Sequence, residues 1–250
     1  MRALPLVRVV ALLTDRSALT REDDMITVEI GPEHTSYRVH KPLLQHHSGY
    51  FRKALRNCWK EGEERKVTID DIEPEAFDIF VDWLYTCKIP KIIDYWTFPS
   101  VQPPATGAPL SYQEQELLAV KAYVVADRLD TPELWYAINN MFVKGLVEIA
   151  PWYESVIYAF ANVPYERRLL QLMVDSHCRH SEALGDANDD EEKLYPELPH
   201  EFLLRVMKRY REFREEGAMN KDLNDCDYHE HVTEEERARC TPAMMPWGKA

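Results

Sequence analysis

Several features that mark common classes of enzyme and membrane protein are missing from this sequence. Glycine accounts for only 8 of the 250 residues. Its nearest pair, Gly49 and Gly62, lies too far apart for a dinucleotide-binding fingerprint or a phosphate-binding loop. No Gly-x-Ser-x-Gly nucleophile elbow is present either, and no apolar stretch approaches the ~18 to 20 uninterrupted residues of a membrane-spanning helix. We therefore expect neither an enzyme nor an integral membrane protein.

Paired cysteine spacings and an excess of basic residues are also missing. The five cysteines, an odd number without paired spacing, fit free thiols in a reducing compartment, and so an intracellular protein of the cytoplasm or nucleus. The 43 acidic residues outnumber the 30 basic ones and give a formal net charge of -13. Because proteins that bind the phosphate backbone normally carry a basic footprint, we expect no nucleic-acid partner.

The clearest pattern begins at Asp24. Apolar and polar residues alternate over Met25–Ile30, as in a strand with one buried face. Residues 37–40 resume the alternation, so the two segments predict a hairpin. Residues 67–69 predict a third short strand.

Two helices are predicted around that third strand. Ser48 is placed to cap a short helix that buries Phe51 and Leu55. A longer helix begins at Pro74, a favourable first helical residue, and carries an apolar stripe at i, i+3, i+4 and i+7. The stripe consists of Phe77, Phe80, Val81 and Leu84. The residues expected to be buried in one core are Val39, Phe51, Phe77, Phe80 and Leu84.

An ordered series of motifs runs through this region and beyond it. The motifs are Asp24-Met25, Val39-His40-Lys41, Leu43-Leu44, Ser48-Gly49-Tyr50-Phe51, Trp59-Lys60-Glu61, Phe77, Leu84-Tyr85-Thr86, Leu118, Tyr123-Val124-Val125-Ala126-Asp127-Arg128-Leu129-Asp130 and Leu134. Together they resemble the signature of a BTB/POZ domain over residues 22–140. The long helical C-terminal region is similar in style to fungal members of the BTB family.

The resemblance implies a fold class and a general function. The fold would be α+β, with helical hairpins flanking a small mixed sheet, followed by an all-α C-terminal region. The function would be that of a noncatalytic module that binds other proteins or a second copy of itself. His40 would have a structural, hydrogen-bonded role near the first helix, as buried polar groups usually do.

One motif of the resemblance implies a more specific partner. BTB adaptors that dock on the cullin scaffold of ubiquitin ligases carry a hydrophobic-x-Glu motif after the helix that follows the Ser-x-Tyr-Phe segment. Trp59 and Glu61 match this motif in place, so they are the predicted partner-binding residues, with the aromatic ring as an anchor. The alternative is that Trp59 folds back onto the core and Glu61 is solvated.

Three further segments, residues 1–21, 91–113 and 141–250, lie outside this pattern and have their own predictions. Residues 1–21 are basic and acid-poor like a presequence, but we expect an unstructured N-terminal extension. Residues 91–113 are proline-rich and predict an exposed insertion, or alternatively a partner-binding arm anchored by Trp96 and Phe98. Residues 141–250 predict helices in series, interrupted by an acidic linker at residues 185–193. One predicted apolar stripe consists of Tyr153, Val156, Ile157 and Phe160, and another of Leu169, Leu170, Leu172 and Met173.

Four residues near the C-terminus form a candidate metal site. Cys226, His229, His231 and Cys240 supply two thiols and two imidazoles, the ligand set of a closed tetrahedral zinc site. The Cys-x-x-His-x-His opening is not a standard finger spacing. We therefore expect solvated tail residues and no cofactor, with zinc as the alternative.

No catalytic group emerges from the sequence. His46 and His47 precede Ser48, but neighbours in sequence rarely reach the bonding geometry of a base and its nucleophile, and Ser48 is already assigned to a cap. The sequence therefore predicts a noncatalytic interaction module of the BTB/POZ type. The alternatives are a substrate adaptor for a cullin-based ubiquitin ligase and, from another class, a zinc-binding or nucleic-acid-associated regulator.

Overall fold

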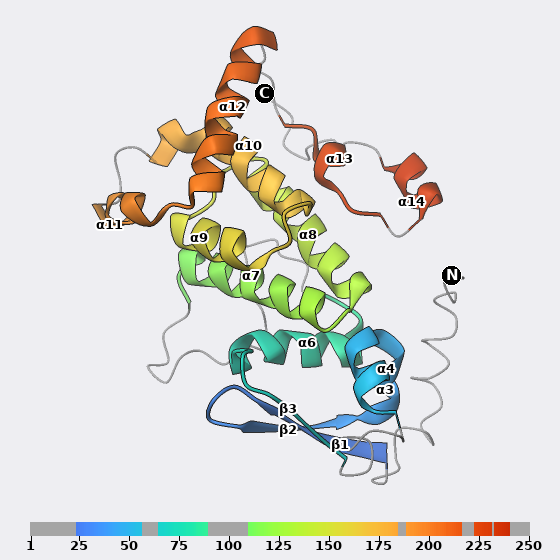
Figure 1. The fold of residues 1–250 in the computed structure, drawn as a ribbon. Helices are drawn as coiled ribbons and strands as arrows, with labels where there is room; N and C mark the ends of the chain where they lie inside the picture. The colour runs from blue at the N-terminus through green and yellow to red at the C-terminus, as the bar shows by residue number, and fades with distance from the viewer. Residues whose placement is uncertain are drawn as a thin grey trace. The chain divides into compact units, whose positions relative to one another are not determined.

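The computed structural model describes six stretches of the chain: residues 24–56, 65–89, 110–184, 189–216, 223–231 and 233–240 (Figure 1). The predicted extension over residues 1–21 lies outside the described residues, as do Trp59 and Glu61 and most of the predicted insertion. The chain divides into two compact units. The first comprises Met1–Cys87 and Arg128–Thr131, and the second comprises Lys88–Asp127 and Pro132–Ala250.

A three-stranded mixed sheet forms the base of the first unit. Strands β1 (Met25–Ile30) and β2 (Thr35–His40) pair antiparallel, with Ile26 opposite Val39. Strand β3 (Lys66–Ile69) pairs parallel to β1, which gives the order β2-β1-β3. The predicted hairpin and third strand are confirmed. Alternate residues of β1 are buried, as a half-buried strand requires.

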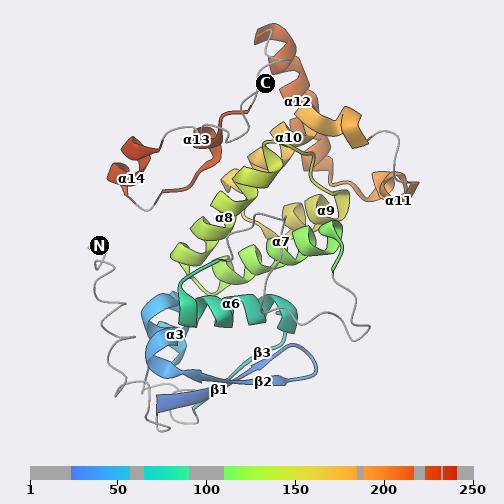
Figure 2. The same ribbon diagram turned by 180° about the vertical axis from the view of Figure 1, so that it is seen from behind.

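Three helices complete the first unit. Helices α3 (Lys41–His47) and α4 (Gly49–Ala54) lie at one end of the sheet, and α6 (Pro74–Thr86) runs along one of its faces (Figures 1 and 2). The five predicted core residues, Val39, Phe51, Phe77, Phe80 and Leu84, are all buried. The Phe80 ring stacks on that of Phe51 at a centroid distance of 6.2 Å, and the Phe77 ring lies 5.3 Å from it. This aromatic cluster is the centre of the unit.

A close joint fixes the start of α4. The Ser48 hydroxyl accepts a hydrogen bond from the Phe51 amide at 3.1 Å, which confirms the predicted cap. It also donates to the Leu129 carbonyl at 2.5 Å. The Gly49 amide donates to the Asp130 carbonyl at 2.9 Å, and a Cβ on Gly49 would lie 1.8 Å from Asp130 Oδ2. The Ser-Gly pair therefore combines a capping hydroxyl with the room that a second segment needs to approach.

The described part of the second unit is helical. Its elements are α7 (Tyr112–Arg128), whose last residue is assigned to the first unit, α8 (Pro132–Leu146), α9 (Tyr153–Asn162), α10 (Arg168–Leu184), α11 (Asp189–Lys193), the 3-10 helix η2 (Tyr195–Glu197), α12 (His200–Glu216), α13 (Asp225–Tyr228) and α14 (Glu234–Arg239). Helices α10 and α12 lie side by side in both views (Figures 1 and 2). None of the helices in the described part of the chain has the length and apolar character needed to cross a membrane. The α+β fold followed by an all-α region agrees with the predicted fold class.

The predicted apolar stripes of the second unit are buried to different degrees. Leu169, Leu170, Leu172 and Met173 of α10 are all buried. In α9, Tyr153 and Val156 are buried, whereas Ile157 and Phe160 are half-buried. The small residues Ser155 and Ala159 are fully buried in α9, as Val156 is.

Two carboxyl groups cap the start of α9. Glu116 of α7 accepts a hydrogen bond from the Trp152 amide at 3.0 Å, and Glu191 of α11 accepts one from the Tyr153 amide at 2.9 Å. Burial raises the pKa of Glu116 to about 8, and it also raises the pKa of Glu191. Residues 189–193, predicted to be part of an acidic linker, form α11 in the structure, and Glu191 within it is buried.

The division by compactness differs from the predicted domain boundary. The resemblance places the helices up to residue 140 in the BTB/POZ domain, whereas α8 and nearly all of α7 belong to the second compact unit. A family boundary follows sequence motifs, while compactness follows packing. The domain limits 22–140 and 141–250 therefore stay a prediction.

Candidate metal centre and partner-binding residues

The segment that carries α13 packs on the helices of the second unit. Tyr228 is only 5% exposed, and its hydroxyl donates to Asp175 Oδ2 at 2.5 Å. Its backbone carbonyl accepts from the Asn139 side chain at 2.9 Å. Burial beside the Asp175 carboxylate raises the pKa of Tyr228, so the phenol stays a donor. In place of the expected solvated tail, the structure has a buried anchor at Tyr228.

Asp175 is the centre of this anchor. Its carboxylate, 3% exposed, accepts two hydrogen bonds from Arg209, Nε to Oδ1 and Nη2 to Oδ2, both at 2.9 Å. This forked geometry is the strong form of an Arg–carboxylate pair. Asp175 thereby joins three elements, because it lies on α10, Arg209 on α12 and Tyr228 on α13.

A second set of hydrogen bonds holds the residues that follow Tyr228. The Asn140 side chain donates to the Glu230 carbonyl at 3.1 Å and accepts from the Glu230 amide at 3.0 Å. The Trp135 indole donates to Glu230 Oε2 at 3.1 Å. On the other side, Arg168 donates to the Asp227 carbonyl at 2.7 Å. The backbone of the segment is thus fixed by side chains of α8 and α10.

Three of the four predicted ligands come together on this fixed segment. One ligand atom from each of Cys226, His229 and Cys240 lies within 4.8 Å of those of the other two. The two sulfur atoms are 3.0 Å apart, and His229 Nδ1 is 3.2 Å from Cys240 Sγ. The hydrogen bond between the two thiols raises the pKa of Cys226 to about 11, and burial lowers that of His229. The cluster thus brings two cysteine sulfur atoms and one imidazole nitrogen within 4.8 Å of one another.

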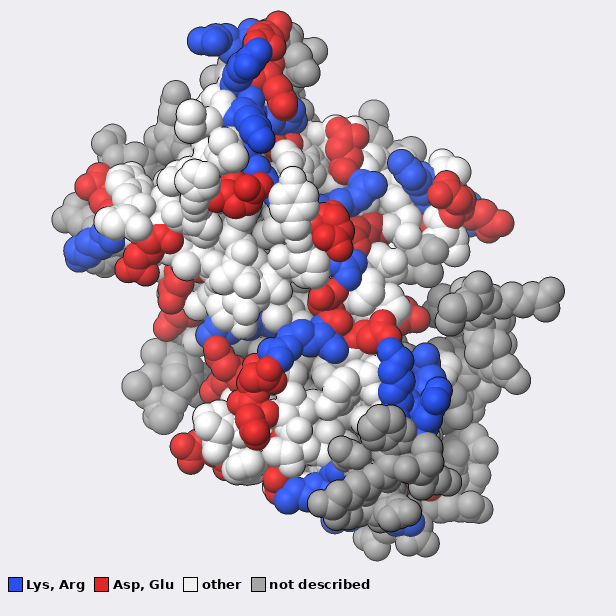
Figure 3. Space-filling model, in the orientation of Figure 1, with Lys and Arg blue, Asp and Glu red and all other residues white. Residues whose placement is uncertain are grey.

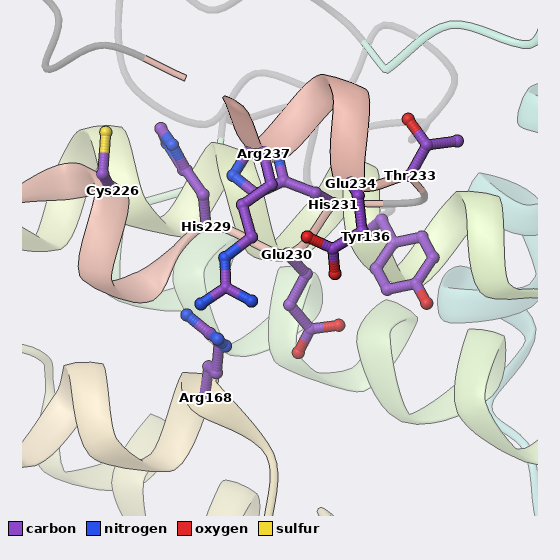
Figure 4. A pocket seen from close by; sticks show the side chains of 9 residues that line it. All are labelled: Tyr136, Arg168, Cys226, His229, Glu230, His231, Thr233, Glu234 and Arg237. Atoms are coloured by element: carbon purple, nitrogen blue, oxygen red, sulfur yellow. The ribbon is translucent and has the colours of Figure 1, made fainter. Parts of the chain in front are cut away.

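His231 does not belong to that close group. Its ring centroid lies 5.8 Å from that of His229, and its Nε2 is buried without a hydrogen-bond partner among the described residues. Figure 4 shows Cys226 and His229 pointing to the same side of the segment, whereas Glu230 points to the opposite side. A pocket of about 330 Å³ opens beside these residues and is also lined by Arg168 and Arg237.

The polar groups of the first unit serve its fold. Ser48 is fully buried and uses its hydroxyl as both donor and acceptor, so it offers no nucleophile. The His47 ring packs edge-on against Trp83, and burial lowers its pKa to about 4. His40 Nδ1 is hydrogen-bonded to the Tyr85 hydroxyl at 2.8 Å. The structural role expected for His40 is confirmed.

A comparison with protein families identifies this first unit. The BTB/POZ domain family model matches residues 17–94. The chain contains a BTB/POZ domain. The matched region holds β1, β2, α3, α4, β3 and α6, which confirms the resemblance drawn from the sequence. The likeness to fungal members with a helical extension stays a prediction.

The predicted partner-binding residues of the BTB/POZ domain fall between two described elements. Trp59 and Glu61 belong to residues 57–64, which lie outside the described part of the chain. This stretch follows α4, the helix that begins after Ser48, and precedes β3. Its place in the chain order is therefore the one that the cullin motif requires, and the roles of Trp59 and Glu61 stay predictions.

Sequence reasoning missed the residues that fix the metal-ligand segment. Asp175 and Arg209 lie on different helices, and no spacing along the chain connects them to Tyr228. One signal was present: Asn139 and Asn140 interrupt the apolar pattern of α8. Adjacent amides within a packed helix call for hydrogen-bond partners, and the structure supplies those partners from residues 228–230.

Proposed function

We propose that this protein acts by binding other proteins through its BTB/POZ domain and carries out no catalysis. The observation that supports this function is the family match over residues 17–94, because BTB/POZ domains are interaction modules. The histidine and serine neighbours at residues 46–48 add support, because Ser48 is buried and its hydroxyl caps a helix. Self-association is the simplest form of this function, because BTB/POZ domains often dimerise.

Sedimentation velocity on the purified full chain tests self-association. The expected result is a species of twice the monomer mass of 29.3 kDa at micromolar concentration. A monomer at every concentration would contradict the homodimer. Affinity capture from cells that express the tagged protein would then test binding to other proteins, with a Phe80→Ala variant, whose domain core is destabilised, as the control.

The charge distribution supports protein partners over nucleic acid. Basic and acidic side chains lie close together on α12, at the top of the view in Figure 3. Arg205 pairs with Glu201, Arg209 with Glu212 and Arg211 with Glu215, each at 2.8 to 2.9 Å. Such paired charges do not make the basic stripe that a phosphate backbone needs, and the net charge of -13 acts in the same direction.

A substrate adaptor for a cullin-based ubiquitin ligase is the second candidate function. The observation that favours it is the order α4, Trp59-Lys60-Glu61, β3 along the chain. An aromatic residue flanked by a carboxylate fits a binding anchor, since interface energy concentrates in aromatic residues seated in pockets. The helical second unit would then have to bind the substrate.

Binding to the amino-terminal domain of a cullin tests this candidate. The double variant Trp59→Ala, Glu61→Lys should lose binding while it keeps the circular dichroism and melting curve of the wild type. Two matched controls in the same stretch, Lys60→Ala and Glu63→Lys, should still bind. Absence of binding by the folded wild type at micromolar concentration would remove the adaptor function and leave the interaction module intact.

A further inference from the structure

The chain between α13 and Cys240 has almost no apolar core of its own. Among the described residues 223–231 and 233–240, Tyr228 alone is buried. No residue of α14 is buried, and this helix has only six residues. Isolated helices of that length are not stable in water. Apart from its cap, in which Thr233 accepts from the Glu236 amide at 3.1 Å, α14 therefore needs a support other than burial.

We propose that this segment binds one zinc ion through Cys226, His229 and Cys240, with His231 as the fourth ligand. Cys226 lies on α13, which Tyr228 anchors to the second unit, and Cys240 directly follows α14. The ion would join the two ends of the segment. It would hold α14 in place where the chain has no buried apolar side chains to do so.

The chemistry of the ligand set selects the ion. Thiolate and imidazole are the ligands that zinc prefers, whereas calcium and magnesium take oxygen ligands. The two sulfur atoms are 3.0 Å apart, well beyond the ~2.05 Å of a disulfide bond. An imidazole nitrogen lies 3.2 Å from one of them. An imidazole takes no part in a disulfide bond, whereas it is a common ligand of zinc.

The fourth ligand follows from an unpaired atom. Structural zinc sites are almost always four-coordinate, and the close group supplies three ligands. His231 Nε2 is buried and has no hydrogen-bond partner among the described residues, a situation that costs free energy unless the nitrogen is satisfied. The ring lies beside His229, at a centroid distance of 5.8 Å. Coordination by His231 would complete the site and satisfy the nitrogen.

Metal analysis of the purified full chain is the first test. Protein expressed with zinc in the medium and dialysed should retain about one equivalent of zinc, and Cys226→Ser and Cys240→Ser should each retain none. Cys87→Ser, which changes an exposed cysteine outside the cluster, is the matched control and should retain the metal. Cys240 follows a helix without buried residues, so its variant tests ligation without loss of the fold.

His231→Ala tests the fourth ligand. Its zinc affinity should fall by more than the ~10- to 100-fold that follows removal of a residue that only supports a ligand. Cobalt(II) in place of zinc should give the sulfur-to-metal charge-transfer band and the intense visible bands of a tetrahedral site in wild type, and weaker visible bands in His231→Ala. Unchanged affinity in His231→Ala would overturn the four-residue set.

Limited trypsin digestion tests the consequence for α14. Arg237 and Arg239 are exposed cleavage sites on this helix. Zinc-loaded wild type should be cut slowly there, and a chelator or the Cys240→Ser substitution should accelerate the cut to the same rate. No retained zinc, a Cys226–Cys240 disulfide found by mass spectrometry, or a cleavage rate unaffected by the chelator would each overturn the proposal.

Discussion

The BTB/POZ core and the segment from Asn224 to Cys240 are fixed in place by different means. In the core, aromatic rings such as Phe51 and Phe80 are fully buried and in contact. In the segment, Tyr228 is the one buried side chain among the described residues, and hydrogen bonds to side chains of α8 and α10 hold the chain. Burial resists most changes of pH and redox state, whereas hydrogen bonds and thiol ligands respond to both. The two regions should therefore fail under different conditions.

Truncation of Phe80 should have the largest effect. Phe80→Ala removes a fully buried ring that contacts Phe51 and Phe77, and large-to-small core changes of this kind lower the free energy of unfolding by ~3 to 5 kcal/mol. That loss is comparable to the whole stability of a marginal domain. Denaturant titration followed by circular dichroism measures it. Glu33→Ala, at an exposed position of the same unit, is the control, and equal midpoints for Phe80→Ala and the control would contradict the core.

Substitution of Arg209, which pairs with the Asp175 anchor of the segment, should have the next largest effect on stability. Arg209→Met leaves the Asp175 carboxylate, 3% exposed, without its charged partner. Breaking a buried pair costs ~3 to 5 kcal/mol, and about 2 kcal/mol is expected here because Arg209 keeps 24% of its side chain exposed. Thermal melting measures the change. Arg211→Met, which removes a pair on the exposed face of the same helix, should change stability by less than ~0.5 kcal/mol.

Loss of the Ser48 cap should lower the free energy of unfolding by less than either Phe80→Ala or Arg209→Met. Ser48→Ala removes the acceptor for the Phe51 amide and the shortest of the hydrogen bonds to the Leu129 carbonyl, which keeps the Tyr50 amide as a donor at 3.3 Å. We expect a loss of ~1 to 2 kcal/mol. Ser48→Thr restores the hydroxyl and should recover part of the loss in the same denaturant titration. A Ser48→Ala protein as stable as wild type would mean that burial alone fixes this joint.

The last prediction concerns Glu116, whose effect on the free energy of unfolding should depend on pH. The folded state holds the Glu116 proton up to about pH 8, whereas an unfolded Glu ionises near ~4.3. Between these values the folded state binds the additional proton, so the free energy of unfolding falls as pH rises, by at most ~1.4 kcal/mol per pH unit.

Glu116→Gln should remove this slope. Urea titrations at about pH 5 and about pH 8 should show a smaller change for the variant than for wild type. Glu133→Gln, an exposed change of the same chemistry on α8, should leave the slope unaltered. Parallel slopes for wild type and Glu116→Gln would show that the carboxyl is ionised in the folded protein.

Local patterns predicted the BTB/POZ core well. The alternation over Met25–Ile30 and the stripe of α6 depend on neighbours along the chain, so the strand, the helix and the five core residues could be read from the sequence. The second bond of Ser48 could not, because Leu129 lies 81 positions away. Periodicity also overestimated the burial of Ile157 and Phe160, since it cannot tell which side of a stripe meets another helix.

Only the residue types of the candidate metal site could be predicted from the sequence. Residue type identified Cys226, His229, His231 and Cys240 as ligands that suit zinc. The distance from Cys240 back to Cys226 depends on the turn between α13 and α14, which no spacing rule specifies. The anchor made by Asp175, Arg209 and Tyr228 lies on three helices far apart in sequence, and its formation depends on how those helices pack.

The joint between Ser48, Gly49 and the turn at Leu129 and Asp130 bears on how the protein is made. Protein chains leave the ribosome from the N-terminus at roughly 5 to 20 residues per second, and domains fold largely as they emerge. The sheet and α6 are synthesised well before residue 129, yet the Ser48 hydroxyl and the Gly49 amide find their acceptors only when that turn arrives. In the nascent BTB/POZ domain these two hydrogen bonds therefore form several seconds after the sheet and α6 have been synthesised. A fragment that stops at residue 94, where the family match ends, could not form them at all.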